Sequence, residues 1–173
     1  MANNCYFEIR IKGSKKSCDA WVKRMKSYEE TNHFYRIFSC DVYLSEYVDK
    51  AKDEYVMEMC GDCAWSLESC CRQSGYSGGI DLFAVNTAEL NLKMEAFSEE
   101  TGMCFQEHYI YEYGVCKKEI CVPFYEYFFD ENLWTCFEDF KSEYKLPKEL
   151  KEIDFDENGL CRVGGFGEWI FSI

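Results

Sequence analysis

Alternating apolar and polar positions predict the strands of this chain. From Cys5 to Lys12 every second side chain is apolar, which is the period of a strand with one buried face. The same reasoning predicts strands over 34–44, 55–61 and 119–128, and a final pair at 160–163 and 168–173. Phe38, Cys40, Val42 and Leu44 are expected on one side of the second strand, and Pro123 indicates an edge position.

The stretch 91–113 is expected to form a hairpin around which the sheet is organised. Its first arm alternates apolar and charged side chains from Leu92 to Ala96, as in a strand with one buried face. A polar turn at 98–102 follows, in which Gly102 is expected to take a positive φ. The return arm, 105–109, mixes aromatic and polar side chains.

A period near 3.6 residues predicts helices between these strands. One should begin after Ser14, its N-cap, and end near Glu30, because Cys18, Trp21, Val22 and Met25 share a stripe. A second is expected over 63–73 with Asp62 as its cap and Ala64, Leu67 and Cys71 buried. A third, over 81–90, should bury Phe83, Ala84 and Ala88.

The order strand, helix, strand, strand, helix, strand predicts an α+β fold with a ferredoxin-like split βαβ antiparallel sheet, extended by the hairpin. This domain is expected to cover 1–125. Residues 126–173 are expected to form an acidic, aromatic C-terminal α/β extension that packs on it. In that extension Thr135 should cap a short helix around Phe137 and Phe140, Pro147 should begin a helical turn, and Asn158-Gly159 should form a tight turn.

The net charge of −13 is unevenly distributed along the 173 residues. Residues 1–53 carry ten basic and eight acidic groups, 54–125 carry four and twelve, and 126–157 carry four and eleven. Such a negative field repels the phosphates of nucleic acid and attracts basic proteins. The alternative interpretation is that the charge serves solubility alone.

Composition further limits the classes of protein. No apolar run approaches the roughly 20 residues of a membrane span, and residues 1–5 do not resemble a signal peptide, so we expect a protein of the host cell cytosol. In that compartment the twelve cysteines are expected to be mostly buried thiols. A zinc site at Cys60, Cys63, Cys70 and Cys71 is the alternative, but the spacing lacks a second matched CxxC, so no metal or cofactor is expected.

Catalytic motifs are absent from the sequence. Of the two histidines, His33 and His108, the second shares a strand face with Gln106, while Glu107 points to the opposite face. A general acid–base role for His108 requires a carboxylate from another strand, which the sequence does not locate. No P-loop, GxSxG, HExxH or EF-hand pattern occurs, so the protein is not expected to be an enzyme.

Three segments carry a family resemblance: the opening Met-Ala-Asn-Asn-Cys-Tyr, the junction Gly61-Asp62-Cys63-Ala64-Trp65-Ser66, and the run from Phe97 to Tyr109. Over residues 1–125 the chain resembles the YubB ferredoxin-like family of phage and plasmid proteins, whose members usually have Trp where Asn4 stands. The resemblance implies a ferredoxin-like fold and a mobile-element setting. It implies no catalytic residues.

Two groups of side chains are the candidate binding residues. The first, at the hairpin tip and its return arm, is Glu99, Glu100, Gln106, Glu107 and His108, with an exposed polar turn as the alternative interpretation. The second combines carboxylates with aromatic anchors: Glu126, Tyr127, Phe129, Asp130, Glu131 and Trp134.

Together these observations predict a non-catalytic phage or mobile-element protein. We expect it to bind and inhibit a host defence protein that handles nucleic acid, through an acidic surface that fits a basic groove, as an anti-CRISPR protein would. Neither direct nucleic-acid binding nor membrane binding is expected, and a homo-oligomer is possible. The alternatives are a small-ligand module that sequesters a signalling nucleotide, for which only the basic stripe on the 15–26 helix offers positive charge, and a scaffold without inhibitory function.

Overall fold

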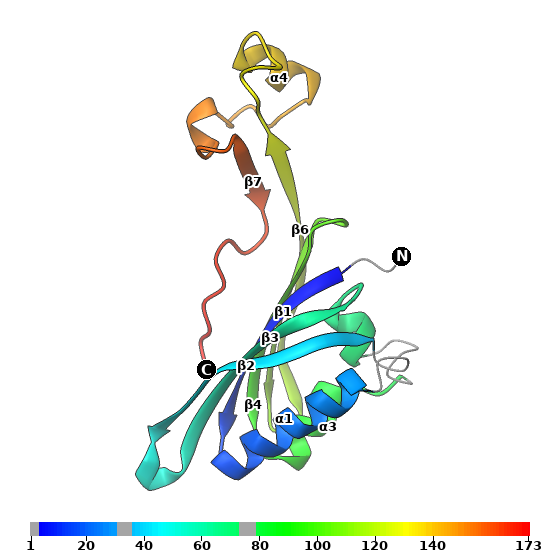
Figure 1. Ribbon diagram of the computed structural model, residues 1–173, viewed down its shortest axis with the longest axis vertical. Helices are drawn as coiled ribbons and strands as arrows, with labels where there is room; N and C mark the ends of the chain where they lie inside the picture. Colours follow the sequence, from blue (N-terminus) through cyan, green and yellow to red (C-terminus); the bar gives the residue numbers. More distant parts are fainter. Residues whose placement is uncertain (1–3, 31–35, 73–78) are drawn as a thin grey trace.

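The protein, described from a computed structural model over residues 4–30, 36–72 and 79–173, is an α+β protein with an open seven-stranded antiparallel sheet (Figure 1). In chain order its elements are β1 (Asn4–Gly13), α1 (Lys15–Glu30), β2 (Ile37–Asp49), η1 (Lys50–Lys52), β3 (Glu54–Ala64), η2 (Glu68–Arg72), α3 (Leu82–Glu89), β4 (Lys93–Glu100), β5 (Phe105–Glu112), β6 (Val115–Phe128), α4 (Phe137–Glu143), η3 (Glu152–Asp154) and β7 (Leu160–Gly164). Within these ranges no helix is long and apolar enough to cross a bilayer.

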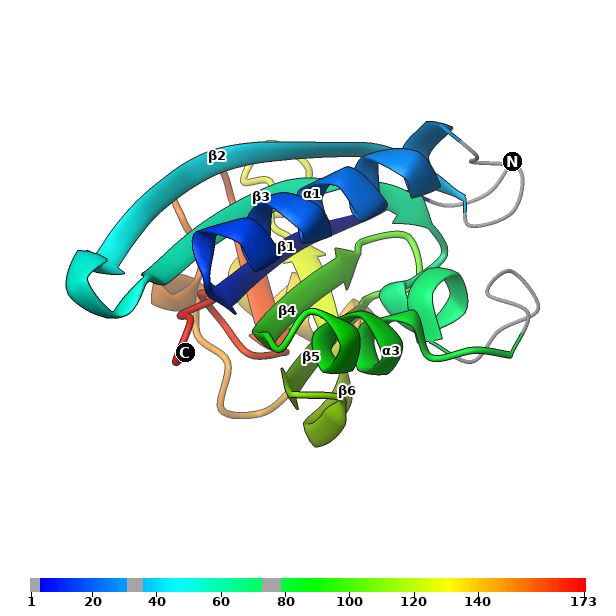
Figure 2. The same ribbon diagram turned by 90° about the horizontal axis from the view of Figure 1, so that it is seen from below.

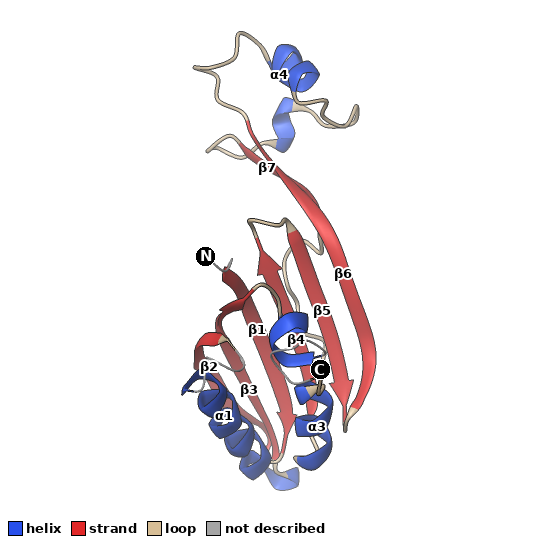
Figure 3. Ribbon diagram, turned by 90° about the vertical axis from the view of Figure 1, so that its right-hand side faces the viewer, coloured by secondary structure: helices blue, strands red, loops and turns tan. Residues whose placement is uncertain are grey.

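The strands lie in the order β2-β3-β1-β4-β5-β6-β7, and each neighbouring pair is antiparallel (Figure 3). β1 is therefore central: its Ile9 is paired with Met59 of β3 on one side and with Ala96 of β4 on the other. The predicted strands at 5–12, 55–61 and on both arms of the hairpin are confirmed.

Helices α1 and α3 and the short η2 cover one face of the sheet (Figure 2). α1 begins where the sequence predicts, because the Ser14 hydroxyl oxygen accepts a hydrogen bond from Ser17 N at 3.1 Å. Its Cys18, Trp21 and Met25 are buried against the inward side of β1, and Trp21 stacks on Phe83 of α3 with ring centroids 6.2 Å apart. This layer forms the main hydrophobic core.

Residues 165–173, which we call the strap, lie over β1, β4 and β5 on the opposite face of the sheet. The strap has no helix or strand and runs from the end of β7 along the side of the sheet away from the helices (Figure 1, red). The predicted strand over 168–173 is therefore wrong. Because helices cover one face and the strap covers the other, Met94, Glu95, Ala96 and Phe97 are all buried, and β4 does not have the single buried face that its alternation predicts.

Residues 129–159 form a separate lobe beyond the end of the sheet, which we call the C-terminal lobe (Figure 1). Its own hydrophobic core consists of Phe129, Phe137, Phe140, Leu146 and Leu150, closed by Cys161 of β7. The lobe is joined to the sheet by β6, which runs unbroken through residue 125 and pairs with β7 beyond Pro123. The expected domain boundary thus falls inside a strand, and Pro123 lies where β6 exchanges its partner β5 for β7.

The predicted helix over 63–73 starts too early, and the described residues are helical there only in η2, over Glu68–Arg72. β3 continues to Ala64, which is paired with Asn4 of β1, and Asp62 is a strand residue that accepts a hydrogen bond from Ser39 at 3.2 Å. Only a five-residue π-helix, η2, follows, and the Ser66 hydroxyl oxygen accepts from Ser69 N at its start. Cys71 and Leu67 are buried as expected. Gln73 lies outside the described residues.

Strand β2 also departs from its predicted pattern. Bulges between Ile37 and Ser39 and between Val42 and Leu44 interrupt the alternation. As a result Phe38 and Val42 are exposed, while Cys40 is buried. The strand extends to Asp49, beyond its predicted end at Leu44. Phe34 lies outside the residues that the structure describes.

Several turns and caps differ in detail. The hairpin reverses with a positive φ at Cys104, not at Gly102. α4 begins at Phe137 after Cys136, so Thr135 is not its cap. Pro147 opens a single turn, closed by Leu150 N donating to its carbonyl at 3.1 Å. α3 is capped by Asp81, but Ala88 is exposed and Ala84 half-buried.

Candidate functional site

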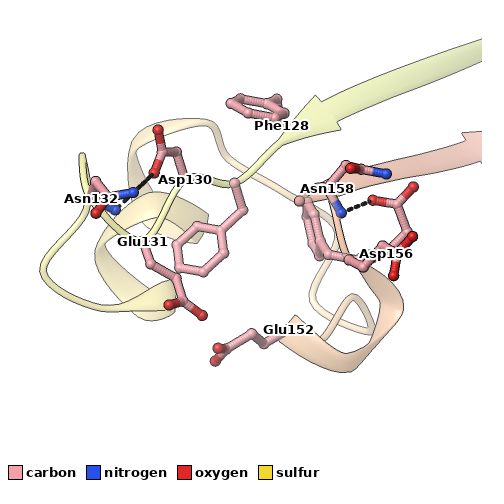
Figure 4. A pocket seen from close by; sticks show the side chains of 11 residues that line it. Phe128, Asp130, Glu131, Asn132, Glu152, Asp156 and Asn158 are labelled. Atoms are coloured by element: carbon pink, nitrogen blue, oxygen red, sulfur yellow. Dashed lines mark hydrogen bonds between the residues drawn. The ribbon is translucent and has the colours of Figure 1, made fainter.

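The C-terminal lobe contains a cavity of about 460 Å³ between the end of β6 and η3 (Figure 4). Five carboxylates line it, together with the rings of Phe128, Phe129 and Phe155: they are Asp130, Glu131, Glu152, Asp156 and Glu157. Phe129, Asp130 and Glu131 are predicted binding residues. Phe128 and the carboxylates from 152 to 157 are not, although the acidic run 152–157 is visible in the sequence.

Two turns hold the walls of this cavity in place. Asp130 Oδ1 accepts a hydrogen bond from Asn132 N at 2.8 Å, and Asp156 Oδ1 accepts from Asn158 N at the same distance. The predicted turn at Gly159 is confirmed: its φ is +76°, and its carbonyl accepts from Phe129 N at 2.7 Å. A Cβ at Gly159 would lie 2.0 Å from the Phe129 carbonyl oxygen, so only glycine fits.

Most carboxylates of the lobe have no ion-pair partner among the described residues. Of the eleven acidic residues in 126–157, only Glu126 forms an ion pair with a basic side chain of the described residues, Arg162 at 2.6 Å. Among the twelve in 54–125, nine lie at salt-bridge distance from a basic side chain: Glu54, Glu58, Glu68, Asp81, Glu89, Glu95, Glu99, Glu112 and Glu119. The free negative charge of the molecule is therefore concentrated on the lobe.

The predicted aromatic anchors of this region are not exposed. Phe129 is buried at the centre of the second core, 5.2 Å from the Phe140 ring, and the half-buried Tyr127 and Trp134 pack against the same cluster. Their role is to hold the lobe together. The exposed ring at the cavity is Phe128, with 58% of its surface accessible.

Most of the predicted recognition cluster at the hairpin is buried, with Glu99 half-buried, and only the turn at 101–103 between the two strands is exposed. Glu100 accepts hydrogen bonds from the turn amides of Gly102 and Met103. Gln106 is fully buried and donates to Glu99 at 2.6 Å, and Glu99 pairs with Arg162 at 2.7 Å. These side chains therefore fasten the hairpin to neighbouring segments.

Glu107 serves as a buried cap for η2. Its carboxylate accepts from Leu67 N at 2.8 Å, from Ser98 Oγ at 2.5 Å, from the Tyr109 hydroxyl at 2.8 Å and from Glu68 N at 3.3 Å. Burial raises the pKa of Glu107, against the opposing effect of these hydrogen bonds. Although Glu107 borders a second cavity of about 460 Å³, its oxygens are already occupied.

His108 does have a carboxylate partner, which the sequence does not locate. Its Nε2 lies 2.7 Å from Glu95 Oε1 of β4, and its ring stacks on Phe97 with centroids 4.0 Å apart. The other oxygen of Glu95 is bound by the strap, through Ser172 N at 2.5 Å and Ser172 Oγ at 2.9 Å. The pair is closed off from solvent, so it holds the strap rather than offering a base to a substrate. His33 lies outside the described ranges.

One cavity of the described residues is lined by basic side chains, but their charges are paired. A cavity of about 390 Å³ beside the start of α1 is lined by three lysines. Each is already paired with a carboxylate at 2.8–3.0 Å: Lys12 with Glu54, Lys52 with Asp49, and Lys93 with Glu112. On the α1 stripe, Lys15, Arg24 and Lys26 are paired likewise. These contacts weaken the case for a nucleotide site.

Cys63, Cys70 and Cys71 are buried and Cys60 is half-buried. In the part of the chain that the structure describes, no group of three or more Cys, His, Asp or Glu side chains is arranged to hold a metal ion. Cys5, Cys18 and Cys40 are buried in the main core, as their phase predicts.

Comparisons of the chain with family models, with curated proteins and with solved structures found no match. The resemblance to the YubB family is therefore an expectation from sequence, and function has to be argued from the site itself.

Proposed function

We propose that this protein is a non-catalytic binding protein whose C-terminal lobe docks onto a basic surface of another protein. The observation that carries the proposal is the set of unpaired carboxylates around the lobe cavity. Carboxylates without an internal partner are free to pair with arginine or lysine side chains, and their field accelerates encounter with a cationic surface.

The chemistry of the cavity favours an arginine or lysine side chain as the inserted group. The side-chain carboxylates of Glu131, Glu152 and Glu157 make no hydrogen bond or ion pair with the described residues, and the exposed Phe128 ring lies beside them. A cation that enters can pair with a carboxylate while its apolar stem or planar head lies against the ring.

The biological role we propose is inhibition of a host defence protein that handles nucleic acid. Such proteins bind phosphates through basic grooves, and a projecting lobe that carries unpaired carboxylates competes for the same groove. The sequence resemblance to phage and plasmid proteins supports this setting. We also assign the first four strands to a ferredoxin-like core, which the order β2-β3-β1-β4 and the helices on one face support.

The test compares two variants of equal charge. Glu131→Gln with Glu152→Gln removes two carboxylates from the cavity, whereas Glu143→Gln with Glu149→Gln removes two exposed carboxylates elsewhere on the lobe. Binding of a labelled arginine-rich peptide is measured by fluorescence anisotropy at low and physiological salt. Since an exposed ion pair contributes about 0.2–1 kcal/mol, the cavity variant should bind roughly two- to thirtyfold more weakly than the unmodified chain.

The control variant should bind within about twofold of the unmodified chain, because it preserves the cavity. Equal losses in both variants would mean that the general field, not the cavity, attracts the peptide. For the inhibitory role, the same three chains are used as bait in host lysate. A nucleic-acid-handling protein retained by the unmodified and control chains but not by the cavity variant is the expected result, and capture independent of the cavity contradicts the proposal.

A further inference from the structure

We propose that the sheet face beneath the strap is a recognition surface for an extended peptide with aromatic side chains, and that the strap occupies this surface in cis. The inference concerns a different face from the acidic lobe and does not rest on the proposed function. It comes from the way in which residues 165–173 are held.

The strap is bound mainly through its backbone amides, as a peptide ligand would be. Phe166 N donates to Gln106 Oε1 at 2.5 Å, and the amides of Ser172 and Ile173 donate to Glu95 Oε2 at 2.5 and 3.2 Å. Both acceptors are fully buried and come from adjacent strands, β5 and β4. Two fixed acceptors of this kind select an extended main chain and not a particular side chain.

Aromatic contacts supply the second part of the recognition. Trp169 lies parallel to Tyr6 and to Phe97, with centroids 5.9 and 5.5 Å away. Phe171 packs beneath the Arg10 guanidinium, whose carbon is 4.8 Å from the ring centroid. The face thus provides one stacking site and one cation–π site, two residues apart along the bound segment.

The strap has few main-chain hydrogen bonds to the rest of the fold. Among the hydrogen bonds of the described residues, its backbone makes one to another main-chain group outside the strap, from Gly165 N to the Pro123 carbonyl at 3.1 Å. Gly164, Gly165 and Gly167 all have positive φ, and Ile170 is 77% exposed. A segment without a backbone ladder, entered through glycines, opens at lower free energy than a strand does.

These contacts define the chemistry of an external ligand. It is an extended segment with aromatic residues at the positions of Trp169 and Phe171, followed by free backbone amides at the positions of Ser172 and Ile173. Because the strap is tethered, its effective concentration is on the order of millimolar, so an external peptide competes poorly with it until the strap is weakened.

The test uses the full chain and a fluorescent synthetic peptide with the sequence of residues 165–173, Gly-Phe-Gly-Glu-Trp-Ile-Phe-Ser-Ile. A chain carrying Trp169→Ala and Phe171→Ala keeps its sheet face but weakens its own strap. It should bind the peptide at least about tenfold more tightly than the unmodified chain does, because the competitor in cis is weakened. Adding Glu95→Gln to that chain should abolish the gain, as should a peptide with both aromatic residues replaced by alanine.

Failure of the strap-weakened chain to bind the peptide more tightly than the unmodified chain would overturn the proposal. The proposal would also be overturned if the strap-weakened chain bound the peptide equally tightly with and without Glu95→Gln. Hydrogen exchange on the unmodified chain is an independent test that does not require the variants to fold. The Ser172 and Ile173 amides should exchange at least about a hundredfold faster than the Ala96 amide in β4. Exchange of all three at one rate would mean that the strap opens only on global unfolding, and the surface would then not be available to a ligand.

Discussion

Replacing Glu107 tests whether this carboxylate is a structural cap and not a recognition residue. The side chain is 2% exposed and accepts four hydrogen bonds, two of them from the backbone at the start of η2. Glu107→Ala removes all four acceptor contacts at once. Glu107→Gln keeps the shape and one carbonyl oxygen, so it is the matched control.

The expected magnitudes follow from the donors that each variant leaves without a partner. In the alanine variant the Tyr109 hydroxyl can turn to Glu68, which lies 3.4 Å away, but Leu67 N and the Ser98 hydroxyl lose their acceptor. A buried donor without an acceptor costs about 1–3 kcal/mol, and the removal of a buried charge offsets part of the sum. We therefore expect Glu107→Ala to lower the free energy of unfolding by about 2–4 kcal/mol.

Glu107→Gln should cost about 1 kcal/mol or less, because its oxygen can still accept from Leu67 N and Ser98 Oγ. The pH dependence provides a second criterion. Since the folded pKa of Glu107 is raised above its usual 4.5, the folded chain binds this proton more readily than the unfolded chain, and the carboxyl stabilises the fold below about pH 4.5. That contribution is lost as the pH rises through the folded pKa, so the stability of the unmodified chain relative to Glu107→Gln should be lower at about pH 7 than at about pH 4.5.

The measurement is urea denaturation followed by circular dichroism and tryptophan fluorescence, for the three chains at both pH values. An alanine variant that loses less than about 1 kcal/mol, or less than the glutamine variant, would refute the capping role. If Glu107→Ala kept normal stability but lost partner binding, Glu107 would be a recognition residue after all.

Three other predictions concern the lobe, the strap and the thiols. Gly159→Ala should disrupt the lobe, because the φ at this position is +76° and the added Cβ would lie 2.0 Å from the Phe129 carbonyl oxygen. Backbone NMR should show loss of chemical-shift dispersion for residues 129–159 while the signals of the sheet are kept, and a native spectrum for the lobe would contradict this. Burial acts to raise the pKa of Glu95, but hydrogen bonds from His108 and the strap outweigh it and lower this pKa. The contribution of Glu95 to strap binding is therefore present above about pH 4.5 and is lost as the pH falls through the folded pKa. Hydrogen exchange that finds the strap amides equally protected at about pH 3 and about pH 7 would contradict this. Cys121 and Cys136 are exposed and should react with a thiol reagent within the time that leaves the seven buried cysteines intact, as peptide mass spectrometry can check.

Several elements of the main layer follow from local patterns, although bulges in β2 and burial of both faces of β4 override the patterns there. The alternation in β1, the stripe of Cys18, Trp21 and Met25 in α1 and the Asp81 cap of α3 each match a period or a capping rule. The concentration of acidic residues in 126–157 was equally visible. It directs attention to the lobe that holds the cavity.

Local patterns in the sequence therefore predict β1, α1, α3, the two hairpin arms and the region where negative charge collects. Which of those charges are paired depends on contacts between segments that are distant in the sequence. Glu99 and Arg162 are 63 residues apart, and Glu95 and Ser172 are 77 apart, so no local sequence pattern predicts these contacts. The same holds for Phe129, because an aromatic side chain among carboxylates looks like an exposed anchor until a second core closes over it. Burial and pairing depend on which distant segments fold together, and that depends on the whole chain.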